Sequence, residues 1–151
     1  MKISELLSPE AVVAEMKASN KDAALSELTE ALLNVAPGLQ RDEVLKVLQE
    51  REELGSTGIG DGVAIPHGKL KGMPELKLAF GRSTGGVDFE SMDGQPAHLF
   101  FLLVAPEDSV GVHLKTLARI SKLLKDVEVR QQMLDAADSA QLYQLICAHD
   151  D

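Results

Sequence analysis

Residues 98–104 read HLFFLLV, and the apolar run that begins at Leu99 continues to Ala105. A membrane span needs about 18 apolar residues or more, whereas this run has the length of a strand. Because no polar side chain alternates with the apolar ones, both faces of the strand must be covered. The run therefore predicts a central strand with helices on either side of its sheet.

The segments around this strand alternate between helical and extended patterns. Helical spacing of apolar residues predicts helices over 20–36, 42–53, 111–125, 127–137 and 140–148. Short apolar or alternating runs predict strands over 63–65 and 76–81, and a partly exposed one at Val87 and Phe89. Together they indicate an α/β fold, a single-domain layered structure over residues 1–151 with a mixed β-sheet flanked by helices.

Two helix starts carry residues that are typical of N-caps. Ser19 with Asp22 resembles a capping pair before the first predicted helix. Ser109 or Asp108 is the expected N-cap of the helix that follows the central strand. Both assignments rest on local spacing alone.

The composition limits the classes of partner. The formal net charge is −9, which argues against nucleic acid and against an anionic membrane surface. The N-terminus is not a secretory signal, and no run is long enough for membrane insertion. The single Cys147 excludes an intrachain disulfide framework. We therefore expect a cytoplasmic protein.

Residues 54–70, LGSTGIGDGVAIPHGKL, hold four glycines between positions 55 and 62. Glycine-rich loops can bind phosphate because backbone N–H groups approach the anion closely, although such loops are also common as plain surface turns. The spacing fits neither the Walker A loop nor the dinucleotide fingerprint. No nucleotide cofactor is therefore expected, and the chemistry has to come from another feature of this segment.

That feature is His67, which stands between Pro66 and Gly68. Proline fixes its own φ and biases the preceding residue to extended backbone, so the imidazole is held on a stiff segment. A neutral imidazole is a competent nucleophile near pH 7. Phosphoryl transfer needs such a nucleophile and donors for the phosphoryl oxygens. We assign the donor role to the Arg51 guanidinium and to phosphate-binding groups of the loop at Ser56, Thr57 and Gly58.

His113 is the second histidine of interest, in the first turn of the helix over 111–125. It shares a face with apolar residues, so it is either packed at the edge of the core or placed at a helix N-terminus that favours an anion. Two histidines are too few protein ligands for catalytic zinc, so no metal is expected. A Ser56–His67–Asp61 hydrolase is disfavoured because no Gly-x-Ser-x-Gly elbow is present.

The run 54–70, preceded by Arg51, resembles the active-site region of the fructose/mannitol-type IIA domains of the bacterial phosphoenolpyruvate-dependent phosphotransferase system. The likeness is closest to the nitrogen-regulatory branch, and it extends over nearly the whole chain. It implies an α/β domain with a mixed sheet. It also implies that His67 accepts a phosphoryl group from an HPr-like phosphohistidine carrier protein, with Arg51 and His113 as the other site residues.

The resemblance leaves three functions open. The first is a phosphocarrier, a phosphotransferase whose phosphorylation state regulates other proteins. The second is a free-standing sugar-specific IIA component that passes the phosphoryl group to a IIB domain. The third is a non-catalytic module that senses an anion. In each case we expect Asp61 to point outward, because a carboxylate beside an incoming phosphate is unfavourable.

Overall fold

The protein is described by a computed structural model that covers residues 2–150. The predicted domain, residues 1–151, thus includes Met1 and Asp151, which lie outside the described residues. Strand β6 (Ala97–Pro106) lies in the middle of the sheet and is buried from Leu99 to Ala105. The central strand predicted from HLFFLLV is therefore confirmed.

The sheet around β6 is mixed, as predicted. On one side β6 pairs antiparallel with β5 (Lys77–Val87), which in turn pairs parallel with β1 (Leu7–Val13). On the other side it pairs parallel with β3 (Val63–Ala64) and β4 (His67–Leu70), and β3 pairs antiparallel with β2 (Gly58–Gly60). The strand order is β1-β5-β6-β3-β2, with β4 also on β6.

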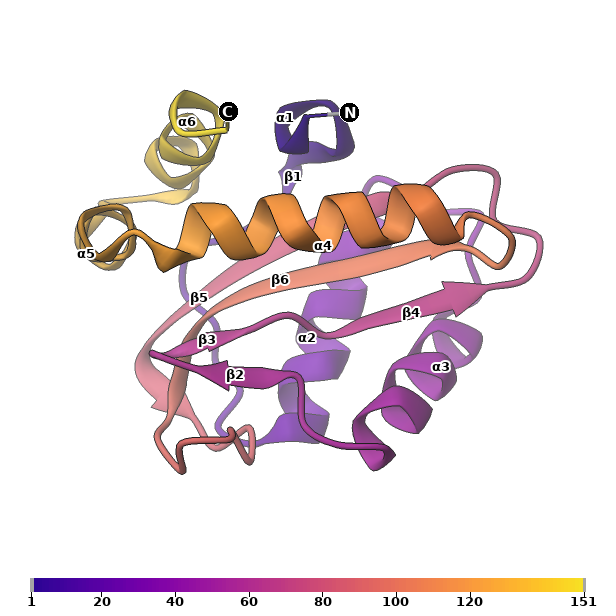
Figure 1. The fold of residues 1–151 in the computed structure, drawn as a ribbon, viewed down its shortest axis with the longest axis horizontal. Coiled ribbons are helices and arrows are strands. Elements are labelled where there is room, and N and C mark those ends of the chain that lie inside the picture. The colour runs from indigo at the N-terminus through magenta and orange to yellow at the C-terminus, as the bar shows by residue number, and fades with distance from the viewer. Residues whose placement is uncertain (1, 151) are drawn as a thin grey trace.

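Helices lie on both faces of this sheet (Figure 1). Helix α4 crosses in front of it and α2 lies behind, while α1, α5 and α6 gather near one edge. The helices are α1 (Ile3–Leu6), α2 (Lys21–Leu33), α3 (Arg41–Glu53), α4 (Val110–Lys125), α5 (Val127–Asp135) and α6 (Ser139–Ala148). In the part of the chain that the structure describes, no helix combines the length and apolarity that a membrane crossing requires.

The predicted strand over 76–81 is longer than expected. Strand β5 continues through Arg82 to Val87, so Val87 belongs to it and does not start a separate strand. Val87 and Phe89 are fully buried, so the expectation that they are partly exposed is wrong. The sequence did not predict this continuation, because a charged residue is rarely buried in a strand. In the structure Arg82 is buried, and its guanidinium donates to the backbone carbonyls of Ala14, Met133 and Ala136.

Four elements were not predicted, namely α1, β1, β2 and β4. Strand β1 contains Pro9, which a sheet tolerates because β1 is at its edge. Strands β3 and β4 run in succession along the same side of β6 and are separated at Pro66, which has no N–H to continue the ladder. His67 therefore begins a strand just after this interruption.

The capping predictions met different outcomes. Asn20, not Ser19, caps α2, since its side chain accepts a hydrogen bond from the Ala23 N–H at 2.9 Å. Ser109 does occupy the N-cap position of α4. Its hydroxyl, however, donates to the Pro106 carbonyl at 2.8 Å and so caps no helix N–H.

Candidate functional site

The orientation of the His67 ring is set by its own neighbourhood in the chain. Its Nδ1 lies 2.7 Å from the Ile65 carbonyl oxygen. A carbonyl oxygen can only accept, so Nδ1 carries the proton and the lone pair of the neutral ring is on Nε2. A Cβ at the next residue, Gly68, would lie 3.0 Å from Val47 of α3, so the glycine lets β4 approach this helix closely.

Arg51 approaches the free nitrogen of this ring from the last turn of α3. Its Nε donates to His67 Nε2 at 3.3 Å, and its Nη1 donates to the Gly55 carbonyl at 2.9 Å. A donor at Nε2 agrees with a lone pair on that atom. The guanidinium is thus held beside the atom that would react, where it can bind phosphoryl oxygens through further N–H groups.

His113 meets His67 from α4. The two ring centroids are 5.4 Å apart and the rings are edge to face. The His113 side chain is only 6% exposed, and within residues 2–150 its buried Nδ1 finds no hydrogen-bond partner. The structure therefore joins all three residues of the predicted catalytic set, His67, Arg51 and His113, in one place.

Both histidines are held neutral near pH 7. Burial lowers the pKa of His67 and outweighs the hydrogen bond to the Ile65 carbonyl, which raises it; the charges of Arg51, which lowers the pKa, and of Glu52, which raises it, have smaller effects. Burial also lowers the pKa of His113 to about 4, helped by the charge that His67 carries when it is protonated and by the charge of Lys69. A neutral His67 keeps its lone pair available, as a nucleophile must.

A pocket of about 540 Å³ opens at this point between α3, β4 and α4. The positive and polar groups of the pocket include Arg51, Lys69 and the two histidines. Leu54, which is 85% exposed, lies at its rim and is apolar. The pocket is lined by Val47, Glu50, Arg51, Glu53, Leu54, His67, Gly68, Lys69 and His113. The sequence interpretation assigned no role to Lys69 or Leu54, although both lie within the run 54–70 that it singled out.

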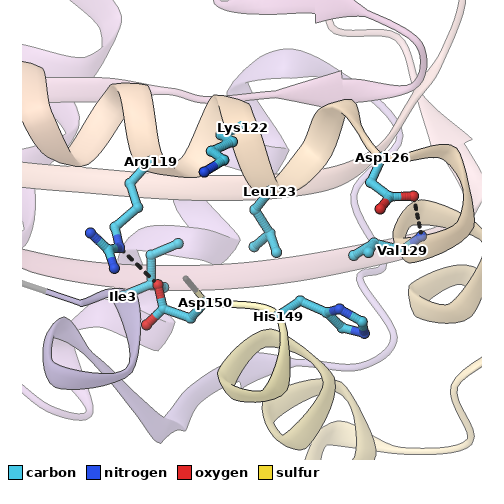
Figure 2. A pocket seen from close by; sticks show the side chains of 8 residues that line it. All are labelled: Ile3, Arg119, Lys122, Leu123, Asp126, Val129, His149 and Asp150. Carbon is cyan, nitrogen blue, oxygen red and sulfur yellow. Dashed lines mark hydrogen bonds and ion pairs between the residues drawn. The ribbon is translucent and has the colours of Figure 1, made fainter.

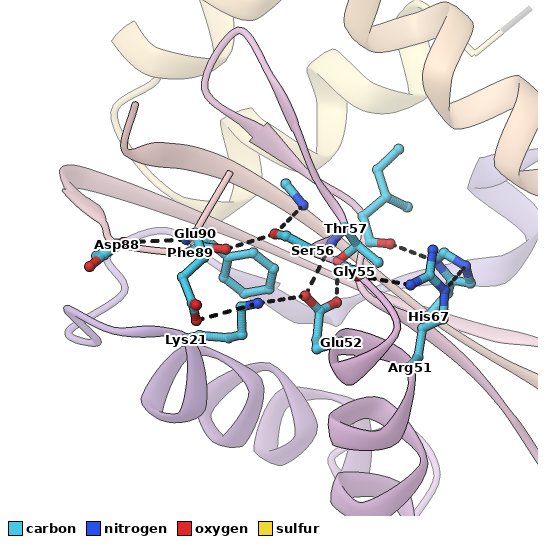
Figure 3. A network of polar contacts seen from close by, with 12 residues as sticks. Lys21, Arg51, Glu52, Gly55, Ser56, Thr57, His67, Asp88, Phe89 and Glu90 are labelled. Carbon is cyan, nitrogen blue, oxygen red and sulfur yellow. Dashed lines mark hydrogen bonds and ion pairs between the residues drawn. The ribbon is translucent and has the colours of Figure 1, made fainter. Parts of the chain in front are cut away.

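The loop residues predicted to bind phosphate are placed differently. Within the described chain, Ser56, Thr57 and Gly58 do not line the pocket. Ser56 donates its hydroxyl hydrogen to the Phe89 carbonyl at 2.8 Å and accepts from the Gly58 N–H at 3.0 Å (Figure 3). Thr57 donates both its N–H and its hydroxyl to Glu52. Their donors hold the loop together, and a phosphate-binding role stays a prediction.

Gly58 has a steric reason to be glycine. A Cβ at this position would lie 2.3 Å from Ser91 Oγ and 3.0 Å from Ser91 Cα. The glycine lets the loop approach the turn around Ser91 closely. Asp61 is exposed, which confirms that it points outward.

A second cavity, of about 150 Å³, lies among α1, α4, α5 and α6 (Figure 2). The Arg119 Nε donates to Asp150 at 3.0 Å there, and Asp150 also accepts from the Ser4 N–H at 2.8 Å. Burial would raise the pKa of Asp150, but these hydrogen bonds outweigh it and lower the pKa. The hydrogen bond between Ser4 and Asp150 joins the two ends of the described chain, and this cavity is separate from the histidine pocket.

The geometry matches a known family. Residues 5–148 fit the sequence profile described as phosphoenolpyruvate-dependent sugar phosphotransferase system, EIIA 2. The chain belongs to this family. The family and fold predicted from the sequence are thus confirmed, and membership gives the chain a part in phosphotransfer between proteins of that system.

Relatives of this EIIA chain include regulatory and sugar-specific proteins. It is 42% identical to a nitrogen regulatory protein of Bradyrhizobium diazoefficiens, with 97% of this chain and 95% of the relative covered. It is 39% identical to a fructose-specific EIIABC component of Bacillus subtilis, covering 99% of this chain but 24% of that protein. A crystal structure of the nitrogen regulatory protein IIA-Ntr from Neisseria meningitidis is 31% identical, with a TM-score of 0.88 over 95% of this chain and 98% of the other. The predicted phosphocarrier function fits these relatives.

Proposed function

We propose that Nε2 of His67 accepts a phosphoryl group from the phosphohistidine of an HPr-like carrier protein, and that the resulting state decides which other proteins this chain binds. The main support is the pair of hydrogen bonds on the His67 ring. The Ile65 carbonyl holds the Nδ1 proton, and Arg51 Nε points at Nε2. The ring is thereby oriented with one reactive nitrogen toward the pocket.

The transfer would proceed as a direct displacement at phosphorus. The Nε2 lone pair forms the new N–P bond as the N–P bond of the donor breaks, and that bond's electron pair stays on the donor ring. The proton remains on Nδ1, where it is hydrogen-bonded to the Ile65 carbonyl, and this bond stabilises the positive charge that the ring gains. Arg51 gives up its contact with Nε2 and binds the phosphoryl oxygens, with His113 as a second polar group of the pocket.

The donor protein would dock on the apolar rim of the pocket. Leu54 lies on one side, and Val110 and Leu114 flank His113 on α4; all three side chains are more than half exposed. Exposed apolar groups around a polar centre are typical of a protein interface. The phosphoryl group then adds about −1.5 to −2 charges to this surface, which changes which partner can bind.

A regulatory role is favoured by the match to nitrogen regulatory proteins over nearly their whole length. The likeness to a fructose-specific EIIABC component supports the second candidate, in which the phosphoryl group passes to a IIB domain for sugar uptake. In either role we propose one IIA-type domain over residues 1–151 that acts in the cytoplasm, consistent with its single cysteine.

Intact-mass measurement tests the proposal. Wild type and His67→Ala are incubated with phosphoenolpyruvate, enzyme I and an HPr-like carrier. We expect an acid-labile gain of one phosphoryl group in the wild type alone. Phosphorylation of His67→Ala at the wild-type rate would refute the assignment to His67. Saturable anion binding without covalent gain would instead support the anion-sensing module.

The same phosphorylated protein separates the two roles. It is mixed with an isolated fructose-type IIB domain, and the phosphoryl group is followed by mass. Rapid transfer would favour sugar uptake. Retention of the phosphoryl group on His67 would favour regulation.

A further inference from the structure

Glu52 is a buried carboxylate that the transfer step does not use. It follows Arg51 directly on α3, and its side chain is only 4% exposed. The carboxylate accepts from the Thr57 N–H at 3.1 Å and from the Thr57 hydroxyl, and it forms an ion pair with Lys21 Nζ at 3.2 Å (Figure 3). A carboxylate in this position is costly unless it is fully paired.

The position in the helix makes the cost larger. Glu52 is in the last turn of α3, where the helix dipole favours a cation and disfavours a carboxylate. Lys21 compensates from the start of α2, and its ammonium also lies 5.3 Å from the centroid of the Phe89 ring. The fold therefore provides the Glu52 carboxylate with a cation and two hydrogen-bond donors. An apolar residue at this position would need none of them.

This pairing holds the short segment between α3 and β2, and both hydrogen bonds of His67 depend on that segment. The first connection runs through Gly55, whose carbonyl accepts from Arg51 Nη1 at 2.9 Å. The second runs through the Thr57 carbonyl, which accepts from the Ile65 N–H at 3.0 Å. The Ile65 carbonyl in turn accepts a hydrogen bond from His67 Nδ1–H. Glu52 thus fixes the residues that orient both ring nitrogens.

We infer that Glu52 is a positioning residue for phosphoryl transfer, with Lys21 as its counter-charge: by clamping Thr57 against the end of α3 it sets Arg51 and Ile65 on the two nitrogens of His67. Glu52 touches neither His67 nor the incoming phosphoryl group in this role. The inference rests on the proposed function of His67. It adds that the rate of phosphoryl transfer depends on the buried ion pair between Glu52 and Lys21, neither of which lines the histidine pocket.

The kinetic test uses Glu52→Gln, which keeps the size and an acceptor oxygen but loses the charge that pairs with Lys21. With the phosphorylated HPr-like carrier as donor, we expect the single-turnover rate at saturation to fall about tenfold to a hundredfold, as small misplacements of reacting groups do. The donor concentration at half-saturation should change less than about threefold, because the docking rim is untouched. A folded Glu52→Gln variant with the wild-type rate would overturn the inference.

A second pair of variants covers the case in which Glu52→Gln does not fold. Thr57→Val removes the hydroxyl bonded to Glu52 at nearly constant volume, and Thr57→Ser retains it. We expect Thr57→Val to lower the saturated rate and Thr57→Ser to restore it. Equal rates in the two variants would contradict the role of the clamp.

The tautomer of His67 can be measured directly, and a variant that is only less stable should keep the wild-type tautomer. Nitrogen-15 chemical shifts of the imidazole in the unphosphorylated protein should show the proton on Nδ1 in the wild type, and a mixture of both tautomers in Glu52→Gln. The matched control is Asp150→Asn, which breaks another buried ion pair, with Arg119, away from the pocket. It should keep the wild-type tautomer.

The two proposals fail in different ways. A wild-type protein that no carrier phosphorylates would refute the proposed function. The tautomer measurement needs no phosphorylation. If His67 keeps its proton on Nδ1 in both Glu52→Gln and Thr57→Val, that result alone would refute the positioning role of Glu52.

Discussion

Acidification should reveal the buried His113 as a loss of stability. The folded state keeps this histidine neutral, with a pKa of about 4, because it is buried and faces His67 and Lys69. In the unfolded chain it takes up a proton with the ordinary pKa of 6.5. The unfolded state therefore binds more protons between these values. The contribution to stability is fully present above pH 6.5 and is lost as the pH falls toward 4.

The size of the effect follows from the two pKa values. Between pH 7.5 and pH 5, the lowered pKa of His113 removes about 2 kcal/mol from the free energy of unfolding. His67 also has a lowered pKa, so it adds a loss in the same direction, and this loss remains when His113 is replaced. The lowered pKa of Asp150 has its effect near and below the ordinary value of 3.8, which is outside this range. The difference between wild type and His113→Phe therefore isolates the His113 share.

Urea unfolding of both proteins at several pH values between 5 and 7.5 measures this difference. We expect the wild type to lose about 2 kcal/mol more than His113→Phe over the range. His149→Gln, which removes an exposed histidine, is the matched control. Parallel pH curves for wild type and His113→Phe would refute the reasoning, as would a shallower curve in the control.

Three further predictions concern single positions. Arg51→Lys should slow phosphorylation of His67 at least about tenfold, because lysine lacks the planar guanidinium fork. The free energy of unfolding in urea should stay within about 0.5 kcal/mol of the wild type. An unchanged phosphorylation rate would contradict the role of the guanidinium. Gly58→Ala should lower the free energy of unfolding by about 1–3 kcal/mol through the clash with Ser91, whereas Gly38→Ala, which meets open space, serves as control in the same urea series. Arg82→Met should lower the free energy of unfolding, measured by heat or urea, by about 3 kcal/mol, because three backbone carbonyls lose a charged donor. A variant as stable as the wild type would show that those carbonyls find other donors.

The sequence was sufficient where the information is local. The unbroken apolar run predicted the central strand, and Pro66 predicted a stiff segment at His67, because both signals lie within a few neighbouring residues. The pairing of His67 with Arg51 and His113 was anticipated from their chemical types and from the family resemblance. It could not be placed in space, since the three side chains come from α3, β4 and α4.

Contacts between residues far apart along the chain could not be predicted. The hydroxyl of Ser56, for which phosphate binding stays a prediction, donates to the carbonyl of Phe89, 33 residues away. The predicted strand over 76–81 ended just before Arg82, whose guanidinium donates to carbonyls 51 and 54 residues further on. No local pattern encodes such pairings, because they depend on how strands and helices pack after they form.

The parallel pairing of β4 with β6 has a consequence for the order in which the protein is made. The segment that contains His67 leaves the ribosome before the strand that holds it, because residues 97–106 follow some 30 positions later. Contacts between distant segments form late in folding, and domains fold as units during synthesis. A nascent chain that ends before β6 therefore carries the proposed nucleophile, His67, without the strand that positions it. We expect competence for transfer only after the C-terminal half of the chain has emerged and α4 has brought His113 beside His67.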